Sequence, residues 1–111
     1  LRRAQPIAES ERLLVAGLSF NIAARRVEKD GREVDITGLE FDLLLALGKR
    51  AGRVVPRDAL LSLAGRDDVT VGERTVDVHI SHLRAKLGDD PKSPKLIKTV
   101  RGVGYVLTKE S

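Results

Sequence analysis

The side chains best suited to chemistry gather in residues 77–82, a segment whose spacing predicts a helix. They are residue types found in hydrolytic triads and metal sites, namely Asp77, His79, Ser81 and His82. Adjacent side chains on a helix diverge by about 100°, so Ser81 and His82 are badly placed to act as a nucleophile and its base. His79 and His82 are three residues apart and can share a face, but two ligands without a nearby third are weak evidence for a metal. We therefore expect neither catalysis nor a metal site.

Composition excludes several other kinds of site. The chain has 111 residues, no cysteine and only three aromatic residues. Without cysteine there is no disulfide, thiolate nucleophile or cysteine-ligated zinc, and so few aromatic rings make a poor platform for stacking single-stranded nucleic acid. The segment Gly102-Val103-Gly104 is too short for a phosphate-binding loop, and no helix follows it. We expect no cofactor and no enzymatic activity.

The excess positive charge lies in the C-terminal third of the chain. The formal net charge is +4. Residues 1–73 contain 12 basic and 12 acidic side chains, whereas residues 74–111 contain eight basic and four acidic ones. A basic segment beside a neutral remainder is typical of a face that binds a polyanion, although an ordinary solvated surface has the same charge pattern.

The length and hydropathy pattern indicate one globular domain. A chain of this size can bury enough surface for a single core. No apolar run approaches the ~18–20 residues of a membrane-spanning helix, and the first ten residues lack the apolar stretch of a secretory signal. We expect a cytoplasmic protein with no membrane partner, in which residues 1–11 form a linker and residues 12–111 form the folded domain.

The elements that must position residues 77–82 begin with a small sheet. Residues 12–36 alternate in short runs typical of three or four antiparallel strands, with a hairpin turn at Asp30-Gly31. A capping box of Thr37 and Glu40 then predicts a helix that Gly52 can end. Val54-Val55 is extended, a second short helix begins at Pro56 and closes at Gly65, and residues 66–72 form a loop.

A third helix is predicted from a second capping box, Thr70 to Glu73, as far as Gly88. Its apolar residues fall within one narrow arc and must face the core: Val76, Ile80, Leu83 and Leu87. The opposite side is mostly neutral or positive and contains no acidic residue: Arg74, Thr75, Val78, Ser81, His82 and Lys86, with His79 at its edge. A helix fits the DNA major groove, where an apolar tip such as Val78 can contact a thymine methyl. The alternative interpretation of this outer side is that it is the solvent face of an amphipathic helix. Asp77 and Arg84 lie on a third, lateral strip of the helix, where a structural ion pair is the favoured role.

A basic hairpin follows the third helix. Residues 89–94 form a loop with two prolines, and strands over residues 96–100 and 105–107 flank a glycine turn. Lys98 and Arg101 place positive charge on or near this turn. A helix-turn-helix followed by a basic hairpin is the winged-helix arrangement, an α+β fold whose hairpin, the wing, can reach the minor groove or the backbone of DNA.

Three separate motifs resemble one family. Residues 73–87 (ERTVDVHISHLRAKL) resemble the recognition helix of the OmpR/PhoB family, the winged-helix output domains of bacterial two-component response regulators. Residues 99–105 (TVRGVGY) look like the wing of that family, and residues 37–44 (TGLEFDLL) look like its first helix. The resemblance covers roughly residues 14–107, in the same order and spacing. It implies sequence-specific binding of double-stranded DNA and regulation of transcription.

The resemblance also implies a role for individual residues. Candidates for phosphate or groove contact are Arg74, Thr75, Ser81 and Arg84; candidates for base readout are Val78 and His82; His79 is expected at the DNA backbone; and the wing positions are Thr99, Arg101 and Tyr105. Among the wing residues, Arg101 is the candidate for insertion into a narrow minor groove. His82 stands where some family members have arginine, which removes a bidentate guanine contact.

The expected partners follow from the same resemblance. Family members carry a receiver domain that is phosphorylated in a phosphorelay, so the chain is expected to begin at the linker and to meet a sensor kinase only through that absent domain. We expect a tandem dimer on direct-repeat DNA and a contact with RNA polymerase through loop 66–72. The alternative is a winged helix used for protein–protein contact or for double-stranded RNA.

Overall fold

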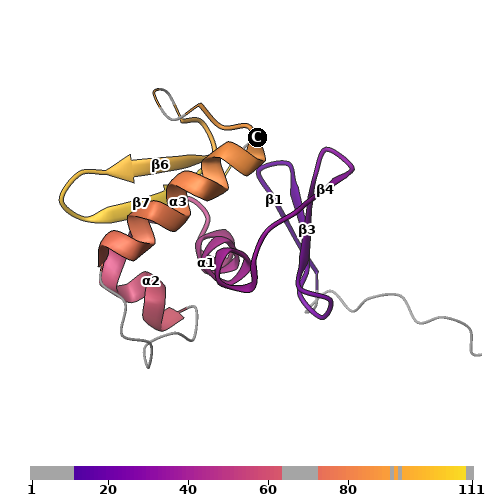
Figure 1. The fold of residues 1–111 in the computed structure, drawn as a ribbon, viewed down its shortest axis with the longest axis horizontal. Helices are drawn as coiled ribbons and strands as arrows, with labels where there is room; N and C mark the ends of the chain where they lie inside the picture. The colour runs from indigo at the N-terminus through magenta and orange to yellow at the C-terminus, as the bar shows by residue number, and fades with distance from the viewer. Residues whose placement is uncertain (1–11, 64–72, 91, 93, 110–111) are drawn as a thin grey trace, which may run out of the picture.

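The computed structural model describes residues 12–63, 73–90, 92 and 94–109, and within the helices the side chains of Leu61 and of residues 73–75 are not described. Figure 1 shows α1 in the middle of the molecule, with the N-terminal sheet on one side and α3 and the C-terminal hairpin on the other. In the described part of the chain, no helix is long and apolar enough to cross a membrane.

The N-terminal sheet has four antiparallel strands in sequential order, which confirms the predicted sheet. The strands are β1 (Arg12–Val15), β2 (Leu18–Asn21), β3 (Arg26–Lys29) and β4 (Arg32–Val34). The turn between β3 and β4 is the predicted one, and both Asp30 and Gly31 adopt positive φ there. Alternation places Leu18 and Phe20 on the buried face of β2, and this face packs against α1.

The helix α1 (Gly38–Lys49) begins at the predicted capping box. The Thr37 hydroxyl accepts a hydrogen bond from the Glu40 N–H, and the Glu40 carboxylate accepts one from the Thr37 N–H. The helix ends before Gly52, the residue predicted to end it. Gly52 has a positive φ and donates its N–H to the Leu107 carbonyl, so it joins the loop after α1 to the C-terminal hairpin.

Two further helices complete the helical part: α2 (Arg57–Leu63) and α3 (Glu73–Leu87). Pro56, predicted to start the second helix, belongs instead to the short strand β5 (Val55–Pro56), which pairs with the C-terminal hairpin. The predicted inner face of α3 is confirmed, since all four of its apolar residues are fully or almost fully buried: Val76, Ile80, Leu83 and Leu87. The second capping box falls outside the described residues at Thr70.

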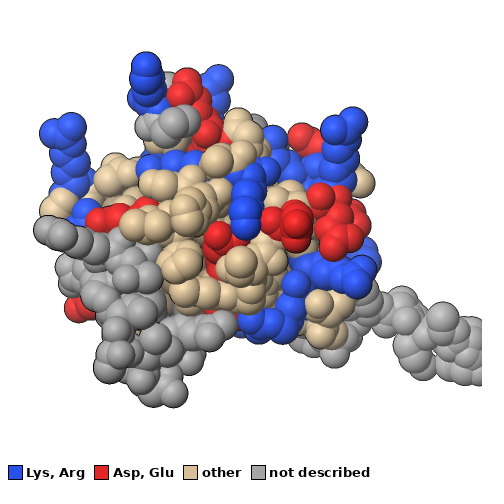
Figure 2. All heavy atoms as spheres, in the orientation of Figure 1, with Lys and Arg blue, Asp and Glu red and all other residues tan. Residues whose placement is uncertain are grey.

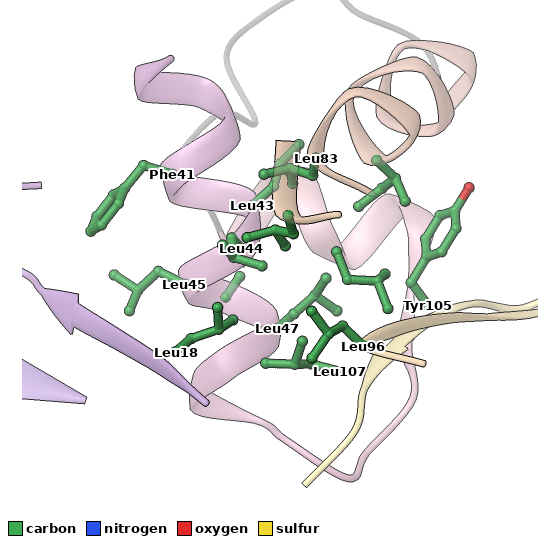
Figure 3. Close-up of a cluster of buried hydrophobic side chains, with 14 of the residues drawn as sticks. Leu18, Phe41, Leu43, Leu44, Leu45, Leu47, Leu83, Leu96, Tyr105 and Leu107 are labelled. Atoms are coloured by element: carbon green, nitrogen blue, oxygen red, sulfur yellow. The ribbon is translucent and has the colours of Figure 1, made fainter. Parts of the chain in front are cut away.

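The wing is a hairpin of β6 (Ile97–Val100) and β7 (Gly104–Leu107), and β5 completes a three-stranded sheet in the order β5-β7-β6. Its buried residues join one hydrophobic core with those of α1, α3 and the N-terminal sheet. Figure 3 shows Leu96 and Leu107 beside the leucines of α1, and Tyr105 at the edge of the cluster with its hydroxyl pointing out of it. The predicted winged-helix architecture is confirmed.

Candidate nucleic-acid interface

The outer face of α3 is exposed, as its spacing predicts. Val78 is 51% exposed although it is apolar, and Ser81 and His82 are also exposed. Figure 2 shows uncharged side chains over much of the middle of this view, with acidic side chains and a basic one among them, and several Lys and Arg side chains projecting at the edge. The side chains of Arg74 and Thr75, both predicted contacts, lie outside the described residues.

Arg84 joins α3 to the wing from the inside. It is only 9% exposed, and its Nε and Nη2 atoms donate to the Ile97 carbonyl at 3.0 and 2.8 Å. Nη2 also donates to the Thr99 hydroxyl at 2.6 Å, and the guanidinium lies 5.6 Å from the centre of the Tyr105 ring. Arg84 therefore fixes β6 against α3, and the predicted DNA contacts of Arg84 and Thr99 stay predictions that these internal bonds disfavour.

A second polar cluster joins α2, α3 and β7. Asp77 accepts a hydrogen bond from Arg57 Nε at 2.9 Å and another from the Tyr105 hydroxyl. The lateral ion pair expected of Asp77 is thus made with Arg57 of α2. Burial raises the pKa of Tyr105, and the hydrogen bond to Asp77 raises it further. Tyr105 is 4% exposed and fully engaged in the protein, which disfavours the DNA contact predicted for it.

The wing presents exposed positive charge. Arg101 is exposed at the tip beside Val103, and Lys98 is exposed on β6. Gly102 adopts a positive φ of 75°, and the Val103 N–H donates to the Val100 carbonyl to close the turn. Arg84 and the hydrogen bond from Tyr105 to Asp77 both fix the wing to α3, so the turn that carries Arg101 is anchored to the same helix that presents the outer face.

Asp89 is a positioning residue that was not among the residues predicted from the sequence. Its buried carboxylate accepts hydrogen bonds from the backbone N–H groups of Lys95, Leu96 and Ile97, at 2.8, 3.1 and 3.1 Å. These bonds set the point where β6 begins and therefore the register of the wing. Its place between a helix end and a proline was the one available signal, because short acidic side chains there commonly bond to nearby backbone N–H groups.

Glu40 has a second role beyond the capping box. It is 2% exposed, and its Oε1 atom accepts from Lys86 Nζ at 2.6 Å while Oε2 lies 3.7 Å from His82 Nδ1. Burial acts to raise the Glu40 pKa, but the hydrogen bonds from Lys86 and the Thr37 N–H, with the charges of Lys86 and His79, lower it overall. Glu40 therefore stays ionised and ties α1 to α3.

The same carboxylate supplies a third ligand beside the two histidines. One ligand atom each from Glu40, His79 and His82 lie within 4.8 Å of one another. His79 is half-buried, and its Nδ1 atom is buried without a hydrogen-bond partner among the described residues. The expectation of no metal site rests on the lack of a third ligand near the two histidines in the sequence, but the fold brings one from a different helix.

Comparison with protein families places the chain among regulatory proteins. Residues 31–107 match the family described as "Transcriptional regulatory protein, C terminal". The chain is 40% identical over 96 residues to the DNA-binding response regulator MtrA of Mycolicibacterium paratuberculosis, covering 86% of this chain and 43% of MtrA. It is 51% identical over 75 residues to the alkaline phosphatase synthesis transcriptional regulatory protein PhoP of Bacillus subtilis, covering 68% of this chain and 31% of PhoP. The chain thus spans less than half the length of these relatives.

Solved structures resemble most of this chain. The RstA DNA-binding domain of Klebsiella pneumoniae, in complex with the RstA box, superposes with a TM-score of 0.80 at 36% identity, covering 90% of this chain and 99% of that domain. The DNA-binding domain of CpxR from E. coli superposes with a TM-score of 0.75 at 34% identity, covering 90% of this chain and 98% of that domain.

Proposed function

The chain belongs to the family of C-terminal domains of transcriptional regulatory proteins, the OmpR/PhoB-type DNA-binding domains of response regulators, and on that premise we propose that it reads specific double-stranded DNA sequences. In this proposal α3 lies in the major groove and the wing lies at the adjacent minor groove. The observation that carries it is an exposed outer face of α3, at Val78, Ser81 and His82, together with a wing that Arg84 anchors to that helix and that exposes Arg101 at its turn. The RstA domain, solved with the RstA box, supports this assignment by analogy.

We assign base readout to Val78 and His82, because both are exposed on the outer face of α3 and a major-groove helix reads bases with such side chains. Ser81 and Arg74 are proposed phosphate contacts, with Thr75 and His79 at the DNA backbone. Arg101 is proposed to enter the minor groove. Arg84, Thr99 and Tyr105 are given a positioning role, because their polar groups already bond within the protein.

Regulation of transcription by a full-length protein is the wider proposal. It includes tandem binding to direct repeats, control by a receiver domain and its sensor kinase, and action in the cytoplasm on the chromosome. Contact with RNA polymerase through loop 66–72 is also proposed, although that loop lies outside the described residues.

The test of DNA binding is the dependence of affinity on salt. Contact with ~4–6 phosphates predicts that log K falls with log salt at a slope of about −4 to −5. Selection from a random duplex library would supply the preferred site, and the slope is measured on that site and on a scrambled duplex. A slope near zero, or no preference over the scrambled duplex, would refute the proposal and favour a protein or double-stranded RNA partner.

Variants separate the two proposed roles. Arg101→Ala should weaken binding on all duplexes and make the slope shallower by about 0.9. Arg12→Ala is the matched control, because it removes the same charge from an exposed position on β1 of the N-terminal sheet, and should leave the slope unchanged. His82→Ala should change the preference among half-sites. An equal loss on every sequence for His82→Ala would contradict its role in base readout.

A further inference from the structure

We propose that Glu40, His79 and His82 form a binding site for a divalent transition-metal ion, with Zn²⁺ as the representative ion. Two imidazoles and one carboxylate are a donor set that zinc uses when three ligands come from protein and a fourth position stays open. Imidazole favours zinc and its neighbours in the first transition row, whereas Mg²⁺ and Ca²⁺ prefer oxygen ligands alone. The site spans two helices, with Glu40 on α1 and both histidines on α3.

The lone pairs needed for a metal are available. Of the two carboxylate oxygens of Glu40, Oε1 accepts from Lys86 and from the Thr37 N–H, while Oε2 faces His82. His79 has a buried ring nitrogen without a partner among the described residues. Buried polar atoms are nearly always bonded, and ligation of a metal is one way in which an imidazole nitrogen becomes satisfied.

Only a small movement of the three side chains is needed to bring their ligand atoms to the spacing found around a zinc ion. Bonds of about 2.0–2.1 Å to zinc put neighbouring tetrahedral ligands roughly 3.3 Å apart, and the three ligand atoms here lie within 4.8 Å of one another. The His82 side chain is 57% exposed, so rotation about its own bonds can bring it inward without moving the core. His79 and Glu40 come from α3 and α1, which pack against each other and already hold the two side chains close.

Lys86 is expected to lower the affinity of the site for a metal ion. Its ammonium lies 2.6 Å from Glu40 Oε1, where it already supplies positive charge to the carboxylate. A divalent ion at Oε2 would share the carboxylate with the Lys86 ammonium at Oε1. Repulsion between these two positive charges would weaken metal binding. Removing the ammonium should tighten zinc binding, an effect opposite in sign to that of removing a ligand.

Binding of a metal ion at this site would be coupled to the binding of DNA. A bound ion would draw the His82 ring toward α1 and away from the outer face of α3, so zinc and specific DNA should each lower the affinity for the other. This consequence rests on the proposed function. The metal site itself does not, because it is tested without DNA.

The test is a zinc titration of the untagged chain near neutral pH, against a chromophoric chelator, with Co²⁺ absorption as a second readout of tetrahedral ligation. The chain contains two histidines and no cysteine, so histidine-dependent binding can only report this site. One equivalent should bind, and His82→Ala and His79→Ala should each weaken binding at least 10- to 100-fold, since even loss of an outer-shell partner costs about that much.

Two variants serve as controls. Ser81→Ala changes the exposed neighbour of His82 on the same helix and should leave zinc affinity unchanged, whereas Lys86→Met should raise it about tenfold or more. Because His82 is exposed, His82→Ala should keep the fold, which circular dichroism verifies. The proposal is overturned if the wild-type chain shows no saturable zinc binding, or if His82→Ala binds zinc as tightly as the wild type.

Discussion

The substitution Arg84→Met tests whether Arg84 fixes the wing to α3 or contacts DNA. The change keeps most of the apolar stem and removes the guanidinium, which donates to the Ile97 carbonyl and to the Thr99 hydroxyl. If the role of Arg84 is to make these internal hydrogen bonds, the main effect of the substitution is a lower free energy of unfolding. Its DNA affinity falls only because the wing is no longer fixed against α3.

The expected loss of stability follows from those bonds. A hydrogen bond to a charged donor contributes about 1.5–3 kcal/mol, and leaving a buried acceptor unpaired costs about 1–3 kcal/mol. The two bonds to Ile97 share one acceptor and are counted once, and Thr99 is exposed enough to bond to water instead. The free energy of unfolding should therefore fall by about 3 kcal/mol, which for a domain near 100 residues lowers the Tm by roughly 14 °C.

Urea unfolding followed by far-UV circular dichroism measures this loss, and DNA affinity is then measured at a temperature where both proteins are folded. The matched control is Lys98→Met, which removes the same charge from an exposed position on β6 and should change stability by less than about 0.5 kcal/mol. The reasoning fails if Arg84→Met unfolds like the wild type while its salt slope becomes shallower by about 0.9, because that result would identify Arg84 as a phosphate contact.

Two further predictions concern the elements that hold the site. Gly104→Ala would place a Cβ 2.0 Å from the Val55 carbonyl oxygen and 2.8 Å from the Pro56 Cα, so β5 and β7 should separate at a cost of at least about 3 kcal/mol. A Cβ at Gly102 would meet no atom, so Gly102→Ala has only the cost of a positive φ, about 1 kcal/mol. Equal urea midpoints for Gly104→Ala and Gly102→Ala would therefore contradict the steric argument. The pKa of Glu40 is lowered in the folded protein, so its contribution to stability is present above its ordinary pKa of 4.5 and is lost as pH falls through the folded value. The stability difference between wild type and Glu40→Gln should therefore shrink in acid, and a difference that grows below pH 4.5 in urea unfolding would refute the assignment.

Local patterns predicted most of the elements because their causes are local. The Thr37–Glu40 capping box joins residues three apart and formed as expected. The inner face of α3 follows from the helical repeat alone. Where a boundary was misplaced, a distant partner decided it: Pro56 suits a helix start, but in the fold it lies opposite Gly104 as part of β5.

The exposure of the candidate site was only partly predictable. Periodicity separated the buried from the exposed residues of α3, and Val78 and His82 are indeed exposed. It gave no way to know that Arg84 turns inward to a carbonyl 13 residues later, or that Tyr105 bonds to Asp77. The family resemblance implies a DNA contact for both side chains, whereas spacing alone places Arg84 on a lateral strip of α3 that suits a structural ion pair.

By itself the sequence determined the order of the elements, the two faces of α3 and the place of the excess charge, since these depend on near neighbours and on residue counts. The tertiary structure decided which polar groups meet. Glu40 and Lys86 are separated by 46 positions and are joined by an ion pair, and the same folding brings Glu40 to the two histidines. Such meetings depend on how α1 packs against α3, because the distance between side chains on different helices is set by packing in the core and not by separation along the chain.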